Sequence, residues 1–217
     1  MKQPKIWLLT LLTIVLGLLS GCSSFSAAEL VRNNLDLIYL DQYSDAYLKR
    51  VNLDKAQAEQ QFQDGLSVEA EVFANLFNIE LDACDASVKE QILALYRQIY
   101  SHSKYEVGTE SRNGDVYLVQ LTVYPIDIFA KVIEEDAEEF GSTMQAREDA
   151  GEFVNMTDAE FETVWSQAVI DMVSGRLDSI DYLEAQTISV QVTQDEDGAY
   201  CIDSSDFQRI DNLMIAY

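Results

Sequence analysis

The sequence is poor in the residues that mark metal sites, flexible linkers and basic binding surfaces. Its 217 residues include one histidine, three cysteines, two prolines and nine glycines, and 14 Lys and Arg stand against 38 Asp and Glu. The single histidine, His102, has no His or Cys partner at ligand spacing, which argues against a zinc site. The net charge of −24 excludes nucleic acid as a partner, because such a surface repels phosphate.

Catalytic and cofactor-binding signatures are also missing. The patterns G-x-S-x-G and H-E-x-x-H and the glycine-rich phosphate loop do not occur. We therefore predict no catalytic residue, no cofactor and no metal. Residues 134–139 and 195–198 are acidic enough to suggest calcium. Helical spacing favours a solvated face for the first run, and Gly198 favours a hairpin turn for the second.

The start of the chain carries an export and lipidation signal. Lys2 and Lys5 precede a short apolar run over residues 6–19, which leads into Ser20-Gly21-Cys22. This order is typical of a signal peptide, and the run is shorter than the roughly 20 residues of a spanning helix. Small residues before a cysteine predict a lipoprotein signal, with Cys22 carrying the acyl chains that hold the protein to a membrane. The alternative is an ordinary secretory signal that ends near a cysteine.

We expect three parts along the chain: a lipoprotein signal peptide over residues 1–21, the lipidated cysteine and a short tether over 22–26, and one domain over 27–217. No linker rich in Pro, Gly or Ser divides the last part, and 48% apolar residues supply a sizeable core. The expected location is the extracytoplasmic face of the bacterial cell membrane. A disulfide is chemically allowed there, so Cys84 and Cys201 are either bridged or two buried free thiols.

Hydrophobic periodicity predicts an α+β fold. Helical spacing predicts helices over residues 27–50, 54–64, 126–149 and 205–215, with further helices opening near Ser67, Ser87 and Thr157. Alternation predicts two hairpins, one turning at Asn113-Gly114 and one at residues 195–198. Two one-sided hairpins favour helices packed on one face of an antiparallel sheet. The expected inward residues are Tyr117, Val119, Leu121, Val123, Ile188, Val190 and Val192.

Three stretches of the chain resemble a group of small lipoproteins from Gram-positive bacteria. They are residues 99–108, residues 115–128 and the ending Gly198-Ala199-Tyr200-Cys201-Ile202-Asp203 before a short helix. The group is similar to the DUF5105 type, and the resemblance covers most of the mature chain. It implies a cystatin-like or NTF2-like fold, anchoring and an envelope location, without an activity to carry over. Cys201 departs from the pattern, since such chains often have another residue in that apolar strand.

Two classes of function remain open. The first is a non-enzymatic, membrane-anchored binding or interaction module with an unknown protein or small-molecule ligand. The second is an enzyme or ligand carrier that uses the cone of an NTF2-like fold. Tyr39, Tyr43 and Tyr47, at spacing four, and Tyr117 on the inner sheet face are either core residues or the lining of a pocket. Tyr117 alone among the inward residues ionises, and only at high pH, which favours the non-enzymatic class.

Overall fold

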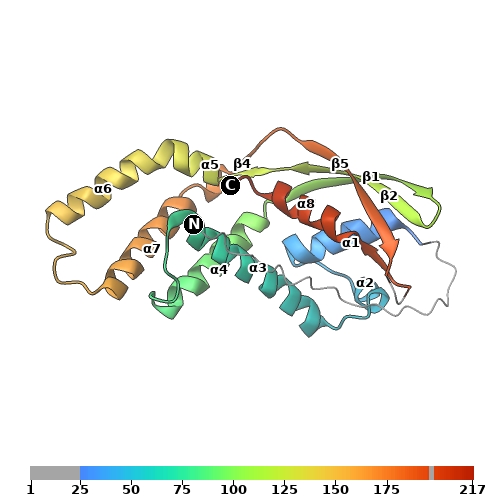
Figure 1. Ribbon diagram of the computed structural model, residues 1–217, viewed down its shortest axis with the longest axis horizontal. Coiled ribbons are helices and arrows are strands. Elements are labelled where there is room, and N and C mark those ends of the chain that lie inside the picture. Colours follow the sequence, from blue (N-terminus) through green and yellow to red (C-terminus); the bar gives the residue numbers. More distant parts are fainter. Residues whose placement is uncertain (1–24, 196–197) are drawn as a thin grey trace, which may run out of the picture.

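Two hairpins build the main sheet of the protein. The computed structural model describes residues 25–195 and 198–217 and has an α+β architecture (Figure 1). The four-stranded antiparallel sheet has the order β1-β2-β5-β6. Its strands are β1 (Lys104–Asn113), β2 (Val116–Tyr124), β5 (Gln186–Gln194) and β6 (Tyr200–Ile202). A small second sheet pairs β3 (Ile126–Asp127) with β4 (Asp181–Tyr182).

Helices cover one face of the sheet and continue beyond its end (Figure 1). α1 and α8 pack on the strands, α3 and α4 pack together, and α7 packs on α4. The helices are α1 (Ala27–Leu40), α2 (Asp45–Arg50), α3 (Lys55–Phe77), α4 (Ala86–Tyr100), α5 (Phe129–Lys131), a π-helical turn (Val132–Asp136), α6 (Ala137–Asp149), α7 (Asp158–Ser174), a 3-10 turn (Leu177–Ser179) and α8 (Ser204–Met214). Among the described residues, no helix has the length and apolar character needed to cross a membrane.

The sheet is apolar on one face only, and this confirms the predicted fold class. Val119 lies opposite Val190 in the β2–β5 register. Both are fully buried, whereas their neighbours Gln120 and Gln191 are exposed. Each buried valine contributes about 1.5–3 kcal/mol, which fixes the register because a slip by one residue would turn these side chains to solvent. Gly114 closes the first hairpin at φ +63°, a conformation that glycine adopts without strain.

The single helix predicted over residues 27–50 is wrong. α1 ends at Leu40, and Asp41 adopts a left-handed conformation with φ 52°. Aspartate tolerates this conformation better than most residues. The Ser44 hydroxyl then accepts a hydrogen bond from the Tyr47 amide and opens α2. The tyrosine spacing of four continues across this break, so periodicity alone concealed it.

The separate helices predicted on either side of Gly65 are one helix. Gly65 lies within α3, which runs unbroken from Lys55 to Phe77. Ser67 does not cap a new helix, because its hydroxyl donates to the Gln63 carbonyl at 2.9 Å. A glycine costs a helix about 1 kcal/mol relative to alanine. The apolar contacts of this long helix outweigh that cost.

Gly65→Ala should therefore stabilise the protein by about 0.5–1 kcal/mol. Apart from its chain neighbours and the backbone of α3 itself, a methyl group at this position meets no atom within 4 Å, and the backbone there is helical. Urea unfolding followed by circular dichroism measures the gain. Gly114→Ala is the matched control and should destabilise the protein, since its φ is +63°. A loss of stability in Gly65→Ala would contradict an uninterrupted α3.

Two other helix boundaries differ from the prediction, and one is confirmed. Asp85, rather than Ser87, caps α4 by accepting the Ser87 amide hydrogen at 2.8 Å. The helix predicted from residue 126 starts with the short strand β3 instead, and a π-helical turn precedes α6. The capping box of Thr157 and Glu160 at the start of α7 is formed as predicted. The second hairpin is also confirmed, because β5 pairs with β6.

Candidate functional site

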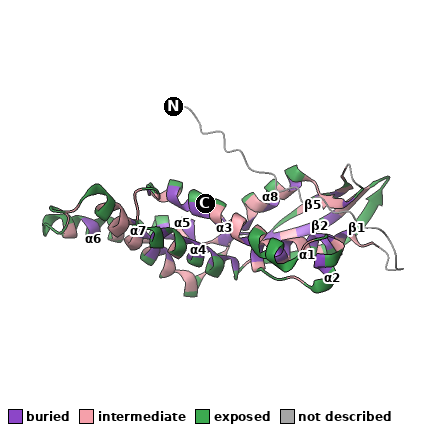
Figure 2. Cartoon of the chain, turned by 90° about the horizontal axis from the view of Figure 1, so that it is seen from below, coloured by how far each residue is buried: buried purple, intermediate pink, exposed green. Residues whose placement is uncertain are grey.

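The end of the molecule away from the main sheet consists of two antiparallel helices. We call this unit the arm; it contains α6, α7 and the turn between them (Figure 1). Most of the arm is exposed or half-buried, in contrast to the centre of the molecule (Figure 2). Met144 is the buried residue of α6. α7 buries its second half, where it packs on α4, in the residues Ser166, Val169, Ile170 and Val173.

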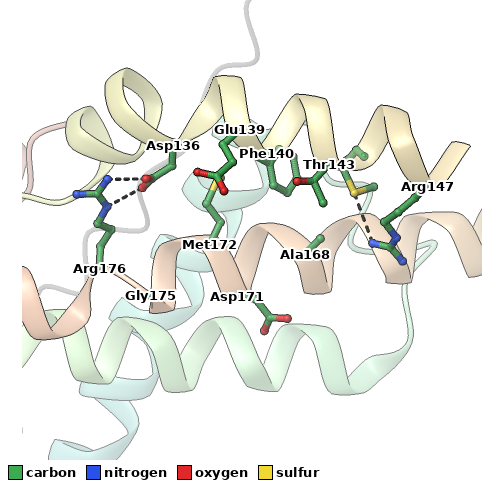
Figure 3. Close-up of a pocket in the computed structure, with 11 residues that line it drawn as sticks. Asp136, Glu139, Phe140, Thr143, Arg147, Ala168, Asp171, Met172, Gly175 and Arg176 are labelled. Atoms are coloured by element: carbon green, nitrogen blue, oxygen red, sulfur yellow. Dashed lines mark hydrogen bonds and ion pairs between the residues drawn. The ribbon is translucent and has the colours of Figure 1, made fainter. Parts of the chain in front are cut away.

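A groove of about 450 Å³ runs between the two helices of the arm (Figure 3). Its floor is apolar and includes Phe140 and Met144 from α6 and Ala168 and Met172 from α7. These residues belong to the apolar stripes that predicted the two helices. The complete lining is Asp136, Glu139, Phe140, Thr143, Met144, Arg147, Ala168, Asp171, Met172, Gly175 and Arg176.

Both arginines of the groove are already paired with carboxylates. Arg176 binds Asp136 through two hydrogen bonds (Figure 3) and Glu135 at 2.6 Å. The hydrogen bonds from Arg176 hold the pKa of Asp136 below its ordinary value. Arg147 binds Glu152 at 2.5 and 2.8 Å. The cationic groups at the two ends of the groove are thus neutralised by the protein itself.

Two acidic side chains of the groove have no basic partner. Glu139 and Asp171 make no ion pair with any residue in the described part of the chain. Asp171 accepts only a neutral hydrogen bond from Gln167 at 2.9 Å. The groove therefore combines an apolar floor with unpaired negative charge.

Trp165 ties the arm to the rest of the protein. Its ring meets Phe140 edge to face, with centroids 5.2 Å apart. Its indole N–H donates to the Phe77 carbonyl, at the end of α3, at 3.2 Å. One side chain thus connects α6, α7 and α3 and sets the position of the groove.

A second cavity of about 540 Å³ lies where α3 ends and α4 begins. The lining is mostly small, polar or charged: Glu71, Ala74, Asn75, Ile79, Glu80, Leu81, Asp82, Ala83 and Lys89. Lys89 and Glu71 pair at 3.7 Å. This cavity lacks the aromatic and methionine floor of the arm groove, so the arm groove is the stronger candidate site.

Glu69 is a buried carboxyl group outside the two cavities, with 8% of its surface exposed. Tyr100 donates a hydrogen bond to one carboxyl oxygen at 2.5 Å, and Tyr217 donates to the other. The Tyr96 hydroxyl lies 3.1 Å from that of Tyr217. Burial raises the pKa of Glu69, and the two tyrosine hydrogen bonds oppose this shift. Because both oxygens are occupied and neither cavity includes Glu69, we assign it a structural role.

The raised pKa of Glu69 predicts a loss of stability as the pH rises above 4.5, its ordinary value. Between that value and the folded-state pKa, the unfolded chain has released the proton while the folded chain keeps it, so the free energy of unfolding falls with rising pH. Glu69→Gln keeps a neutral group of similar size and should remove this contribution. Urea unfolding between pH 4 and 7 tests it, with the exposed Glu90→Gln as control. Equal pH slopes for wild type and Glu69→Gln would contradict the prediction.

The four tyrosines considered as pocket residues lie in different places. Tyr39 is buried and donates to Asp211 on α8 at 3.0 Å. Tyr47 is buried, and its hydroxyl accepts a hydrogen bond from Asn34 of α1. Tyr43 is half-buried and precedes α2. Tyr117 lies at the sheet end, 5.1 Å from the Phe25 ring. Neither of the two cavities includes any of these four tyrosines.

Cys84 and Cys201 both carry free thiols, so the disulfide alternative is not formed. Cys84 contacts the Ser166 hydroxyl at 3.3 Å, and Cys201 lies 3.7 Å from the Thr193 carbonyl oxygen. Each thiol is half-buried rather than fully buried. Burial raises the pKa of Cys201, which makes it a poor nucleophile. Cys22, the predicted lipidation site, lies outside the described residues.

His102 and the first acidic run, residues 134–139, make contacts within the protein. His102 is exposed just after α4, where its backbone carbonyl accepts a hydrogen bond from Tyr182. Glu135 and Asp136, in the first acidic run, bind Arg176. Across residues 25–195 and 198–217, no three His, Cys, Asp or Glu side chains are grouped so that they could hold a metal.

Sequence reasoning missed Glu69, and of the charged residues of the groove it considered only Asp136 and Glu139, as part of the acidic run 134–139. Glu69 falls in the apolar stripe of α3, at helical spacing from Phe62, Leu66 and Phe73. An acid in such a stripe was a signal of burial. The groove carried no comparable signal, because it depends on how α6 and α7 pack together.

Comparison with known proteins finds a solved structure with a similar fold, but it does not assign the chain to a family. No family model and no curated protein matches the chain. The fold is similar to that of a solved structure from Bacillus subtilis subsp. subtilis str. 168, described as a "putative lipoprotein (ycdA)", with a TM-score of 0.61 and 12% identity. The match covers 88% of this chain and 56% of the other, so the chain spans little more than half of that protein. At this identity the likeness concerns the fold alone, and it does not assign the DUF5105 type.

Proposed function

We propose that the chain is a lipid-anchored, non-enzymatic interaction module at the extracytoplasmic face of a bacterial membrane. The observation that carries the proposal is the arm groove, which combines an apolar, partly buried floor with unpaired negative charge. The inner sheet face supports the same reading, because Val119, Leu121, Val123, Val190 and Val192 are fully buried by packed side chains. The pattern at Cys22 and the Bacillus subtilis fold relative support the anchor. Membership of the DUF5105 type stays a prediction.

The position of the first described residues supports an arm that faces away from the membrane. Phe25, three residues after Cys22, stacks on Tyr200 with centroids 4.0 Å apart. Ser26 donates to Glu110 of β1 at 2.9 Å, so the chain is held to the sheet already within the expected tether, residues 22–26. The described chain thus begins at the sheet end, and the arm lies at the other end of the long axis (Figure 1). A lipid on Cys22 would leave the groove accessible to partners.

Metabolic labelling with a radioactive fatty acid tests the anchor. The full chain expressed in a bacterial host should incorporate label and sediment with membranes, and Cys22→Ser should lose both properties. Two long acyl chains, at about 0.8 kcal/mol per buried methylene, make attachment nearly complete. Cys84→Ser is the matched control and should stay labelled. A labelled Cys22→Ser chain, or an unlabelled wild type in the cytosol, would refute the anchor.

A further inference from the structure

The arm concentrates negative charge around an apolar groove. Residues 131–176 contain 12 Asp and Glu and 3 Lys and Arg, a formal net charge of −9. Within the groove, Arg147 and Arg176 are neutralised by their own carboxylate partners. Glu139 is left to interact with a ligand, and Asp171 lies at the rim of the groove with its carboxylate turned away from α6 (Figure 3). A group that pairs with these acids must be cationic.

The floor of the groove requires an apolar surface from the same ligand. Phe140 and Met172 are half-buried and face the open groove between the helices (Figure 3). Met144 and Met172 are flexible and polarisable, which suits them to contact with apolar side chains of varied shape. Two packed helices with an apolar seam between them resemble the grooves that receive amphipathic helices.

Charge decides between the possible occupants. A second copy of the chain would bring another arm of charge −9 against the first, and anionic lipid would be repelled in the same way. A cationic amphipathic helix satisfies both the floor and the unpaired acids. We infer that the groove binds a helical segment of a partner protein, and that this segment has an apolar face flanked by Lys or Arg. This inference rests on the proposed function.

A synthetic helix tests this inference directly. The full chain in non-ionic detergent is titrated with a peptide of about 18 residues, or five turns, with Leu on one face and Lys on the other. Calorimetry gives the Kd, and Trp165 beside Phe140 reports binding by fluorescence. Glu139→Gln should raise the Kd about two- to fivefold, and Met172→Lys should raise it about tenfold or more because it places a cation on the floor. Glu138→Gln, which removes the same charge outside the groove, should change it little.

The controls separate groove binding from general attraction to a polyanion. A peptide of the same composition with Lys and Leu scrambled lacks the apolar face and should bind at least about tenfold more weakly. Equal binding of the scrambled peptide or of oligolysine would overturn the inference, as would no binding at all. An equal effect of Glu138→Gln, or self-association that the peptide does not reverse, would also overturn it. The titration is repeated with Cys22→Ser, so a failure of the anchor and a failure of the groove give different results.

Discussion

Replacing Phe129 with alanine should lower the free energy of unfolding by about 3–5 kcal/mol. Phe129 is fully buried at the start of α5, where four rings surround it. It stacks on Tyr217 with centroids 5.0 Å apart, meets Phe73 edge to face, and packs at a tilt against Phe77 and Tyr96. Truncation leaves a cavity and removes aromatic contacts worth about 0.5–1.5 kcal/mol each beyond their buried area. α3, α4, α5 and the last residue would all lose a shared contact.

Urea unfolding of the full chain measures this loss. Phe129→Leu fills most of the cavity and should cost clearly less than Phe129→Ala. Val154→Ala is a surface control, since Val154 is 78% exposed, and should change stability by less than about 0.5 kcal/mol. A loss below about 1 kcal/mol for Phe129→Ala would contradict the packing of the aromatic cluster.

Trp165→Ala should loosen the arm before the rest of the protein unfolds. Trp165 is half-buried, and its indole joins the Phe140 ring to the Phe77 carbonyl. We expect a loss of about 2–3 kcal/mol, below the full cost of truncating a completely buried aromatic residue. Because α6 packs mainly through Phe140 and Met144, its amides should exchange with solvent faster while those of β2 and β5 stay protected.

Hydrogen exchange measured by mass spectrometry separates these regions. Trp165→Phe is the matched control, because it keeps a ring against Phe140 and loses only the donor to Phe77. It should cost about 0.5–1.5 kcal/mol, the net contribution of one hydrogen bond, and leave α6 largely protected. Unchanged exchange of α6 in Trp165→Ala would show that this side chain does not hold the arm.

The strands were predictable because their pattern is local. Val119 alternates with Gln120 at the period of a strand with one buried face, and Asn113-Gly114 has the backbone freedom that the turn needs. Helix boundaries were less predictable, because they depend on competing terms of similar size. At Gly65 tertiary packing outweighs a local penalty of about 1 kcal/mol. At Asp41 a left-handed residue ends a helix whose tyrosine spacing continues.

The candidate site was much less predictable than the fold. The sequence predicted that Phe140 and Met172 lie on apolar helix faces, but not that these faces leave a groove open between them. It also showed Glu139 as one acid in a solvated run, although the structure places Glu139 in the lining of the groove and leaves its neighbour Glu138 outside it. The open groove and the place of Glu139 in it both depend on how α6 and α7 pack against each other. This packing leaves no periodic pattern in the sequence.

Hydrogen exchange of the full chain with saturating cationic amphipathic peptide is the most direct test of the arm as the interaction surface. Binding in the groove predicts new protection in residues 137–149 and 158–176, with no change in the strands of the main sheet. Protection centred on the sheet, or spread evenly over the acidic surface, would contradict an interaction module that works through its arm.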